Sequence, residues 1–193
     1  MNKTCRSAAV TLATLFAGAF VLGCSVIPGV GNDVDVSHHV NVGASENVTI
    51  NEQTWEAEQQ PSSDTPWTVE GGDAISYEES FDVRGTGFDK LYQTGRNGLD
   101  SISFDLPNGV YMVQLHFAET SPDIQEAGKR TFDVSVEDVT VLSGYDPYAS
   151  AGGHRTASIQ TIDNVQVKDG SLDITFSEKK GSPLLHGIKV QSK

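Results

Sequence analysis

The sequence predicts an all-β fold, a β-sandwich or jelly roll, on two observations. Short runs in which apolar and polar residues alternate recur through residues 48–193 and are separated by turn signals. No window shows sustained helical periodicity with caps. Many short strands at regular spacing are typical of sandwiches and jelly rolls. The length of 193 residues and the hydrophobic content of 37% suit one domain with an ordinary apolar core.

The clearest predicted strands flank the turn signal Pro107-Asn108-Gly109. Residues 101–106 and residues 110–117 each alternate between apolar and polar side chains. A Pro-Asn-Gly turn between two such runs predicts a β-hairpin. Further strands are predicted at residues 131–136, 139–142, 159–167, 172–176 and 185–190, with Asp169-Gly170 as a turn.

The first 23 residues have the features of a bacterial export signal. Lys3 and Arg6 precede an apolar stretch over residues 8–22, which is short for a membrane span. The stretch ends in Val21-Leu22-Gly23-Cys24, which resembles a lipobox, where the chain is cut before the cysteine and the cysteine is acylated. Two or more acyl chains anchor a protein stably. The alternative is an ordinary signal peptide with a chance cysteine. We expect a signal peptide over residues 1–23, lipidation of Cys24, for example with palmitate, and a place in the bacterial cell envelope, at the outer membrane or the cell surface.

Residues 24–47 are predicted to be a flexible linker, and residues 48–193 the folded domain. Glycine, proline and polar residues are frequent in this segment, as in tethers. One part of it, with valines of one parity between residues 34 and 42, favours a strand or a strand-prone arm. His38-His39 lies in this arm, and we expect a solvated pair rather than a metal site, because no third ligand has a fixed spacing to it.

Charge and motif content exclude several functions. Acidic residues outnumber basic ones 26 to 13, for a formal charge of -13, which opposes nucleic-acid binding. No glycine-rich loop leads into a helix, so nucleotide binding lacks support. Two cysteines rule out a disulfide scaffold, and no calcium-loop spacing is present. The sequence predicts neither a metal nor a cofactor.

A series of motifs follows in order along residues 50–191. They are Ile50-Asn51 with Thr54-Trp55-Glu56-Ala57-Glu58-Gln59; Leu91-Tyr92-Gln93-Thr94-Gly95-Arg96; Pro107-Asn108-Gly109-Val110-Tyr111 with Leu115-His116-Phe117-Ala118-Glu119; Lys129-Arg130-Thr131-Phe132-Asp133-Val134-Ser135-Val136; and Val167-Lys168-Asp169-Gly170-Ser171-Leu172-Asp173-Ile174 with residues 185–190. This series resembles malectin and the bacterial malectin-like carbohydrate-binding modules. The resemblance implies a jelly-roll β-sandwich of the galactose-binding type and non-catalytic binding of a poly- or oligosaccharide.

Candidate sugar-contacting residues lie at predicted strand ends, where loops of a rigid scaffold carry binding sites. A sugar offers an apolar ring face and a rim of hydroxyls, so its sites combine aromatic platforms with fixed polar groups. The candidates are Tyr77, Tyr92, Arg96, Asn97, Glu119, Tyr145, Asp146 and Tyr148. Structural roles remain open for several of them: a core position for Tyr92, a buried ion pair between Arg96 and Glu119, and a cover over the sandwich edge for Tyr145 and Tyr148.

The sequence departs from malectin at the positions of its stacking platform. Malectin has a tyrosine directly after its arginine and an aromatic pair after its Phe-Ala-Glu motif; here these positions are Asn97, Ser121 and Pro122. Gly181 stands near the place of a malectin acid. These departures favour a different glycan or, as the alternative function, a structural or protein-interaction lipoprotein with an envelope protein partner. Catalysis would need paired carboxylates, and no motif fixes such a pair, so we expect no enzyme.

Overall fold

The computed structural model describes residues 35–58 and 65–193, which belong to one folded unit, Val34–Lys193. The predicted signal peptide over residues 1–23 and the predicted lipidation site Cys24 lie outside the described residues. Within the two described ranges, no helix is long and apolar enough to cross a membrane.

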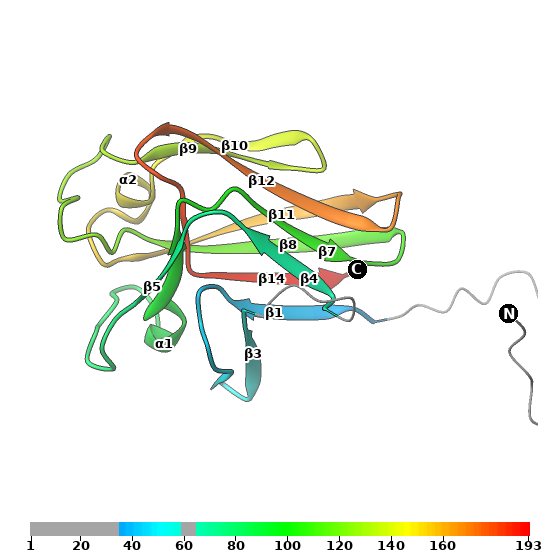
Figure 1. Ribbon diagram of the computed structural model, residues 1–193, viewed down its shortest axis with the longest axis horizontal. Coiled ribbons are helices and arrows are strands. Elements are labelled where there is room, and N and C mark those ends of the chain that lie inside the picture. The colour runs from blue at the N-terminus through cyan, green and yellow to red at the C-terminus, as the bar shows by residue number, and fades with distance from the viewer. Residues whose placement is uncertain (1–34, 59–64) are drawn as a thin grey trace, which may run out of the picture. The chain divides into compact units, whose positions relative to one another are not determined.

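Two antiparallel-rich sheets pack face to face, which confirms the predicted sandwich (Figure 1). The six-stranded sheet has the order β11 (Ala157–Val167), β8 (Gly109–Ala118), β14 (Gly187–Ser192), β1 (Ser37–Asn41), β3 (Gln53–Ala57), β2 (Val48–Ile50). The five-stranded sheet has the order β10 (Val139–Tyr145), β9 (Thr131–Val136), β12 (Ser171–Lys180), β7 (Ser101–Asp105), β4 (Trp67–Glu70). A small third sheet joins β13 (Leu184–Leu185), β6 (Thr94–Asn97) and β5 (Asp73–Ser76).

The main core lies between the two large sheets and follows the period-two pattern of the sequence. Along β9 buried and half-buried residues alternate strictly, so Phe132 and Val134 point inward. Leu115 and Phe117 of β8 meet them from the other sheet within one apolar cluster. Three aromatic residues of the motif segments, Tyr111, Phe132 and Trp55, are all buried.

The predicted hairpin around Pro107-Asn108-Gly109 is wrong. β7 pairs with β12 and β4 in one sheet, whereas β8 pairs with β11 and β14 in the other, so this link crosses between the sheets. The Tyr111 hydroxyl donates to the Pro107 carbonyl at 2.6 Å, and the Asn108 amide donates to the Lys168 carbonyl at 2.7 Å. The link between β11 and β12, which contains Lys168, also crosses between the two sheets, and it does so at the same end of the sandwich. The turn signal marked the change of direction but carried no information on the pairing partner.

The predicted boundary between linker and domain, at residues 47 and 48, is also corrected. β1 pairs antiparallel with β14 and parallel with β3, and Val40 and Val42 are fully buried, so the domain begins at least eleven residues earlier, by Ser37. The histidine pair is not solvated. His38 packs edge-on against Trp67 with ring centroids 5.6 Å apart, and His39 packs against Trp55 at 5.2 Å, on the opposite face of the sheet.

A second apolar cluster covers part of the outer face of the six-stranded sheet. It contains Ile50, Trp55, Phe81, Val83, Leu91, Tyr92 and Ala118. Because this cluster buries the outer face, β1 is buried on both sides, unlike a solvent-facing strand. Two short helices, α1 (Asp89–Tyr92) and α2 (Pro147–Ala151), lie with β5 at the left end of the sandwich in Figure 1. The candidate site lies at this end.

Candidate functional site

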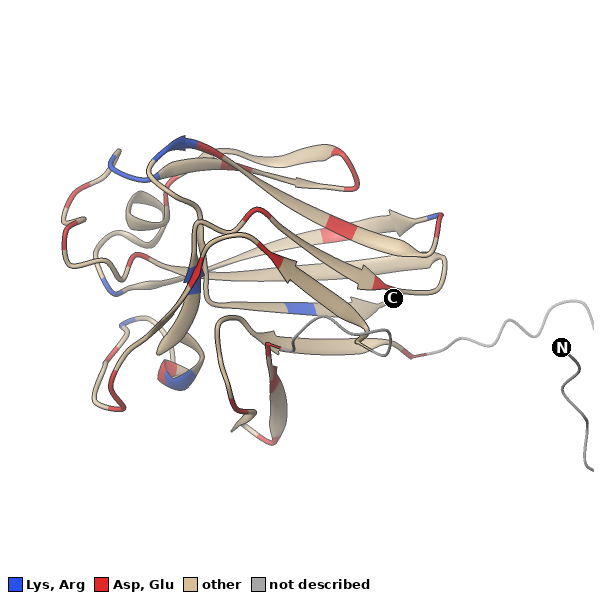
Figure 2. Cartoon of the chain, viewed as in Figure 1, with Lys and Arg blue, Asp and Glu red and all other residues tan. Residues whose placement is uncertain are grey.

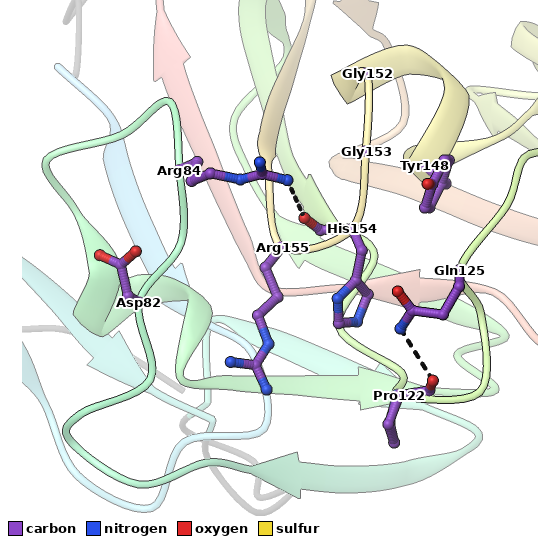
Figure 3. A pocket seen from close by; sticks show the side chains of 9 residues that line it. All are labelled: Asp82, Arg84, Pro122, Gln125, Tyr148, Gly152, Gly153, His154 and Arg155. Carbon is purple, nitrogen blue, oxygen red and sulfur yellow. Dashed lines mark hydrogen bonds between the residues drawn. The ribbon is translucent and has the colours of Figure 1, made fainter.

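Two adjoining hollows open among the loops at the end of the sandwich that carries α2 and β5. The larger, here called the arginine hollow, has a volume of about 670 Å³ and is lined by Asp82, Arg84, Pro122, Gln125, Tyr148, Gly152, Gly153, His154 and Arg155 (Figure 3). The smaller, here called the small hollow, has about 130 Å³ and is lined by Ile75, Tyr77, Asn97, Thr120, Ser121, Pro122, Arg130 and Leu184. Pro122 belongs to both, so the hollows are neighbours.

The small hollow collects the positions at which the sequence departs from malectin. Asn97, Ser121 and Pro122 come from distant parts of the chain and line the same hollow. The positions of malectin's stacking platform therefore lie together in this fold, and small or polar residues occupy them here. Among the described residues that line it, only Tyr77 supplies an aromatic ring, and the Tyr77 hydroxyl donates to the Thr120 carbonyl at 3.3 Å.

A buried ion pair forms the floor beside the small hollow. Arg130 Nε donates to Glu119 Oε2 at 2.7 Å, and both side chains are nearly inaccessible, with 6% and 0% of the side chain exposed. Arg130 also donates to Asn97 Oδ1 at 2.7 Å and to the Ser182 carbonyl. Glu119 further accepts the Ser121 backbone N–H at 3.0 Å. Since every charge here has protein partners, this group fixes the loops rather than offering a free charge to a ligand.

The arginine hollow is built on backbone contacts between segments 82–84 and 152–157. Arg84 and Arg155 are tied by a hydrogen bond from the Arg84 N–H to the Arg155 carbonyl at 2.9 Å, and the Arg155 N–H donates to the Glu119 carbonyl at 2.8 Å. The Arg84 guanidinium donates to the His154 carbonyl at 2.7 Å. A Cβ on Gly153, whose φ is +154°, would lie 3.2 Å from Arg84 Nη2. Glycine at this position thus lets the Arg84 head group approach the loop.

Arg155 connects the two hollows through a stack of rings. Its guanidinium carbon lies 4.1 Å above the centroid of the Phe81 ring. Phe81 in turn stacks on Tyr77, with ring centroids 4.0 Å apart and an angle of 13° between the planes. Arg155 itself is exposed, so the stack orients its guanidinium without removing it from solvent.

Four of the predicted contact residues, Tyr92, Glu119, Tyr145 and Arg96, have structural roles within the domain. Tyr92 and Glu119 are fully buried and Tyr145 is 8% exposed, so in this structure none of the three presents its side chain to a ligand. The proposed pairing of Arg96 with Glu119 is corrected: Arg96 pairs with Glu58 and donates to the Gly71 and Gly72 carbonyls, while Glu119 pairs with Arg130.

The other predicted residues lie nearer the hollows. Tyr77 and Asn97 line the small hollow and Tyr148 lines the arginine hollow. Asp146 caps α2 by accepting the Ala149 N–H at 3.0 Å, and its other oxygen accepts the Gly128 N–H at 2.5 Å. Asp146 therefore holds the α2 segment and the loop before β9 together, and its role is to shape the site.

Sequence reasoning missed most of the arginine hollow. Its lining residues Asp82, Arg84, Pro122, Gln125, His154 and Arg155 were not among the candidates. One available signal was Gly152-Gly153 directly before His154-Arg155, a glycine pair leading into two basic residues in an acidic chain. The contribution of Arg84 could not be found this way, because it comes from a loop about seventy residues earlier and is brought in by tertiary contacts.

His116 and His186 are buried, and their surroundings favour the neutral imidazole. Burial lowers the pKa of His116 to about 4, with further lowering from His186, His39 and Lys189. Burial lowers the pKa of His186 to about 4 as well, although its ring nitrogens face the Thr94 and Ala118 carbonyls. Burial also raises the pKa of Tyr92, whose hydroxyl lies 3.2 Å from His116 Nδ1. Among the described residues no group of three or more His, Cys, Asp and Glu side chains could hold a metal ion.

Known proteins with similar sequences carry this region as a part of much longer chains. The chain is 35% identical over 131 residues to the kinesin-like protein KIN-14E of Oryza sativa subsp. japonica, covering 64% of this chain and 12% of that protein. It is 33% identical over 107 residues to receptor-like protein 4 of Arabidopsis thaliana, covering 52% of this chain and 17% of that protein. The chain thus spans a small fraction of these relatives.

Solved structures of other proteins share this fold. A β-glucuronidase of Bacteroides uniformis superposes with a TM-score of 0.73 at 25% identity, covering 82% of this chain and 18% of the enzyme. The plant receptor-like kinase FER superposes with a TM-score of 0.64 at 18% identity, covering 82% of this chain and 49% of that chain, and shows the shared fold. The profile of the malectin domain matches residues 36–189. The chain therefore belongs to the malectin domain family, whose domains are binding modules.

Proposed function

We propose that this protein is a non-catalytic carbohydrate-binding lipoprotein of the bacterial cell envelope. The observation that carries the proposal is the pair of adjoining hollows at one end of a malectin sandwich, with a combined lining of aromatic rings and fixed polar groups. Such a lining suits a ligand with apolar ring faces and a rim of hydroxyls. Loops on a rigid double sheet hold the lining in place.

The arrangement of the ends suits a tethered binding module. β1 begins at the end of the sandwich away from α1 and α2, where Ser37 pairs with Gln191, so the chain enters the domain at the end remote from the hollows (Figure 1). A lipid on Cys24, as the lipobox-like sequence predicts, would tether the domain through the residues that precede β1.

The chemistry of the hollows favours binding over catalysis. Glycoside hydrolysis uses two carboxyl groups, roughly 5 to 9.5 Å apart, on either side of the scissile bond. Among the described lining residues the arginine hollow has one carboxylate, Asp82, and the small hollow has none. Glu119, which directly precedes the lining residue Thr120, is buried and paired with Arg130.

Retention of the purified protein on a panel of immobilised polysaccharides tests the sugar-binding part. We expect retention on at least one polysaccharide and a several-fold loss in Gln125→Ala, because the exposed Gln125 amide lines the arginine hollow. Gln166→Ala, on the far part of β11, is the matched control and should bind as the wild type does. Failure to bind any polysaccharide would contradict the proposal.

Palmitate labelling of growing bacteria that express the full chain tests the anchor. We expect label in the wild type and none in Cys24→Ala, because the thiol is the acceptor of the acyl group. Equal labelling of the two proteins would rule out lipidation at this cysteine.

A protein-interaction role is the second candidate, and one observation favours it. An apolar trough of about 340 Å³ lies along the edge strands β10 and β11, lined in part by Val136, Val139, Val141, Ile162 and Val165. Val139 is 63% exposed and lies beside other apolar residues of this trough, and contiguous exposed apolar surface is typical of protein–protein contact sites. Crosslinking in cells followed by purification distinguishes the roles: a stoichiometric protein partner lost in Val139→Ser and insensitive to added sugars would favour this candidate.

A further inference from the structure

We propose that the arginine hollow recognises the anionic group of an acidic saccharide, with Arg84 and Arg155 as its charged donors. This inference rests on the proposed carbohydrate binding and adds the chemical class of the ligand. The shared chemistry is a carboxylate or sulfate on a sugar ring, which presents oxygens in the geometry that a guanidinium binds with two parallel hydrogen bonds.

The first argument is the pairing of the arginines. Of the four arginines in the described ranges, Arg96 pairs with Glu58 and Arg130 with Glu119, whereas Arg84 and Arg155 have no carboxylate within 4.0 Å. Acidic residues outnumber basic ones two to one in this chain, 26 to 13, so an unpaired arginine is not explained by a shortage of acids. Both unpaired arginines line the same hollow.

The second argument is that protein contacts fix both guanidinium groups yet leave most of their donors free. The Arg84 group is held by one hydrogen bond to the His154 carbonyl, and the Arg155 group by its stack on Phe81. An arginine has five N–H donors. The contact of Arg155 is with a ring face and that of Arg84 uses one nitrogen, so donors remain for a ligand at defined positions. Fixing the side chains beforehand lowers the entropy cost of binding.

The third argument is the neutral polar groups beside the arginines. His154 Nε2 is buried and has no hydrogen-bond partner among the described residues, which is costly unless a ligand or water supplies one. Gln125 and Tyr148 add an amide and a hydroxyl to the same lining. Figure 3 shows these groups and the Arg155 side chain around one opening. Charged donors for an anionic group and neutral partners for hydroxyls are the combination that an acidic sugar requires.

The negative charge of the whole chain means that an anionic ligand can bind only where cations are locally concentrated. At a formal charge of -13 the protein repels a polyanion at long range, and acidic positions are spread over the loops and strands (Figure 2). Asp82 lines the hollow too, but it forms no ion pair with either arginine. Binding of a polyanion by such a protein needs a local cluster of unpaired cations. Hydrogen bonds between charged partners are about twice as strong as neutral ones, so the two guanidiniums would supply the strongest contacts to such a ligand.

Affinity electrophoresis or calorimetry at about 0.15 M salt, close to physiological ionic strength, tests the inference with matched polymers. Polygalacturonate is compared with highly methyl-esterified pectin, which lacks most of the carboxylates, and dextran sulfate with dextran. We expect binding of an acidic polymer at least about tenfold tighter than of its neutral match. The two pairs distinguish a carboxylate ligand from a sulfate ligand.

Charge-neutral variants assign the binding to the hollow. Arg155→Gln, at an exposed position, should weaken binding of the acidic polymer about tenfold or more, and Arg84→Gln should do the same. Lys168→Gln removes an equal charge at the opposite end of β11 and should change the affinity less than twofold. Unaltered binding in Arg155→Gln would overturn the inference even if Arg84→Gln proved unfolded.

The outcomes separate the inference from the proposed function. Equal binding of acidic and neutral polymers would overturn the acidic ligand and leave carbohydrate binding in place. Binding of neutral polysaccharides alone would do the same. Binding of none of the polymers, acidic or neutral, would overturn both.

Discussion

The two pairs of described arginines show opposite uses of the same side chain. Arg130 and Arg96 are enclosed and bound to Glu119 and Glu58, with side-chain exposures of 6% and 17%. Arg84 and Arg155 are exposed, lie in one hollow and have no acidic partner. Arg130 lines the small hollow, which shares Pro122 with the arginine hollow.

The difference distinguishes residues that hold the fold from residues that remain available for a ligand. A buried charge must have its partners, because an uncompensated buried charge costs several kcal/mol. An exposed arginine is solvated without a partner and can exchange water for a ligand. Conservative substitutions should therefore affect unfolding in the first pair and binding in the second.

The largest expected effect is on stability at the buried pair. Arg130→Met leaves Glu119 buried without its counter-charge and removes the donor to Asn97 and to the Ser182 carbonyl, so we expect a loss of about 3–5 kcal/mol in the free energy of unfolding. Urea denaturation followed by tryptophan fluorescence measures it. A loss below about 1 kcal/mol would show that the pair behaves like a surface ion pair.

The next effect is acid sensitivity from the buried histidines. The pKa values of His39, His116 and His186 are lowered from 6.5 to about 4 in the folded protein, first of all by burial. The unfolded chain therefore binds more protons between these pH values, so stability is full above about pH 6.5 and falls as the pH drops toward 4. Each such histidine contributes a slope of up to about 1.4 kcal/mol per pH unit.

Denaturation midpoints from pH 8 to pH 4.5 measure this slope, with the range above pH 7 as the internal reference. In His116→Gln one titrating group is gone, so the slope should be shallower even if the variant is less stable overall. A slope unchanged by this substitution would mean that His116 does not titrate with folding.

A smaller effect is expected at the loop that shapes both hollows. Asp146→Ala removes the cap of α2 and the acceptor of the Gly128 N–H, so we expect a loss of about 1 to 2 kcal/mol in stability. Because Tyr148 and the loop before β9 lose their mutual support, binding of saccharides should weaken as well. Asp163→Ala in β11, which removes only an exposed ion pair with Lys193, is the control: it should leave binding unchanged and alter stability by less than about 1 kcal/mol.

The smallest expected effect on stability is at the unpaired pair. Arg155→Gln removes an exposed guanidinium with one ring contact, so the free energy of unfolding should change by less than about 1 kcal/mol. The same thermal and urea measurements check it. A loss as large as that of Arg130→Met would show that Arg155 holds the fold, and would remove the distinction between the pairs.

The alternating runs of the sequence predicted the strands well because one face of each strand is buried in the sandwich. Residues 131–136 form β9 as predicted, and Phe132 lies in the core. The pairing was predicted less well, since Pro107-Asn108-Gly109 has the same local signal whether the chain returns beside its own strand or crosses to the other sheet. The sequence predicts a linker over β1 because the strand's own residues do not reveal what covers its outer face. In the structure Trp55 and its neighbours cover that face.

The candidate site was predicted only where sequence motifs coincide with loops. The family motifs led to Asn97, Ser121 and Pro122, which do line one hollow. Tyr92 and Tyr145 were candidates because they are aromatic, but both are buried in the apolar clusters. Large rings fill a core as readily as they line a sugar site, so aromatic character alone does not distinguish the two. Arg84 and Arg155 meet only through the bridge between residues 84 and 156, a tertiary contact without a local signature.

A crystal structure of the protein soaked with an oligogalacturonide tests the role of the unpaired arginines most directly. We predict that the sugar lies in the arginine hollow, with one carboxylate within about 3.2 Å of guanidinium nitrogens of Arg84 and Arg155. A sugar bound only in the small hollow beside Tyr77, or with its carboxylates away from both arginines, would contradict it.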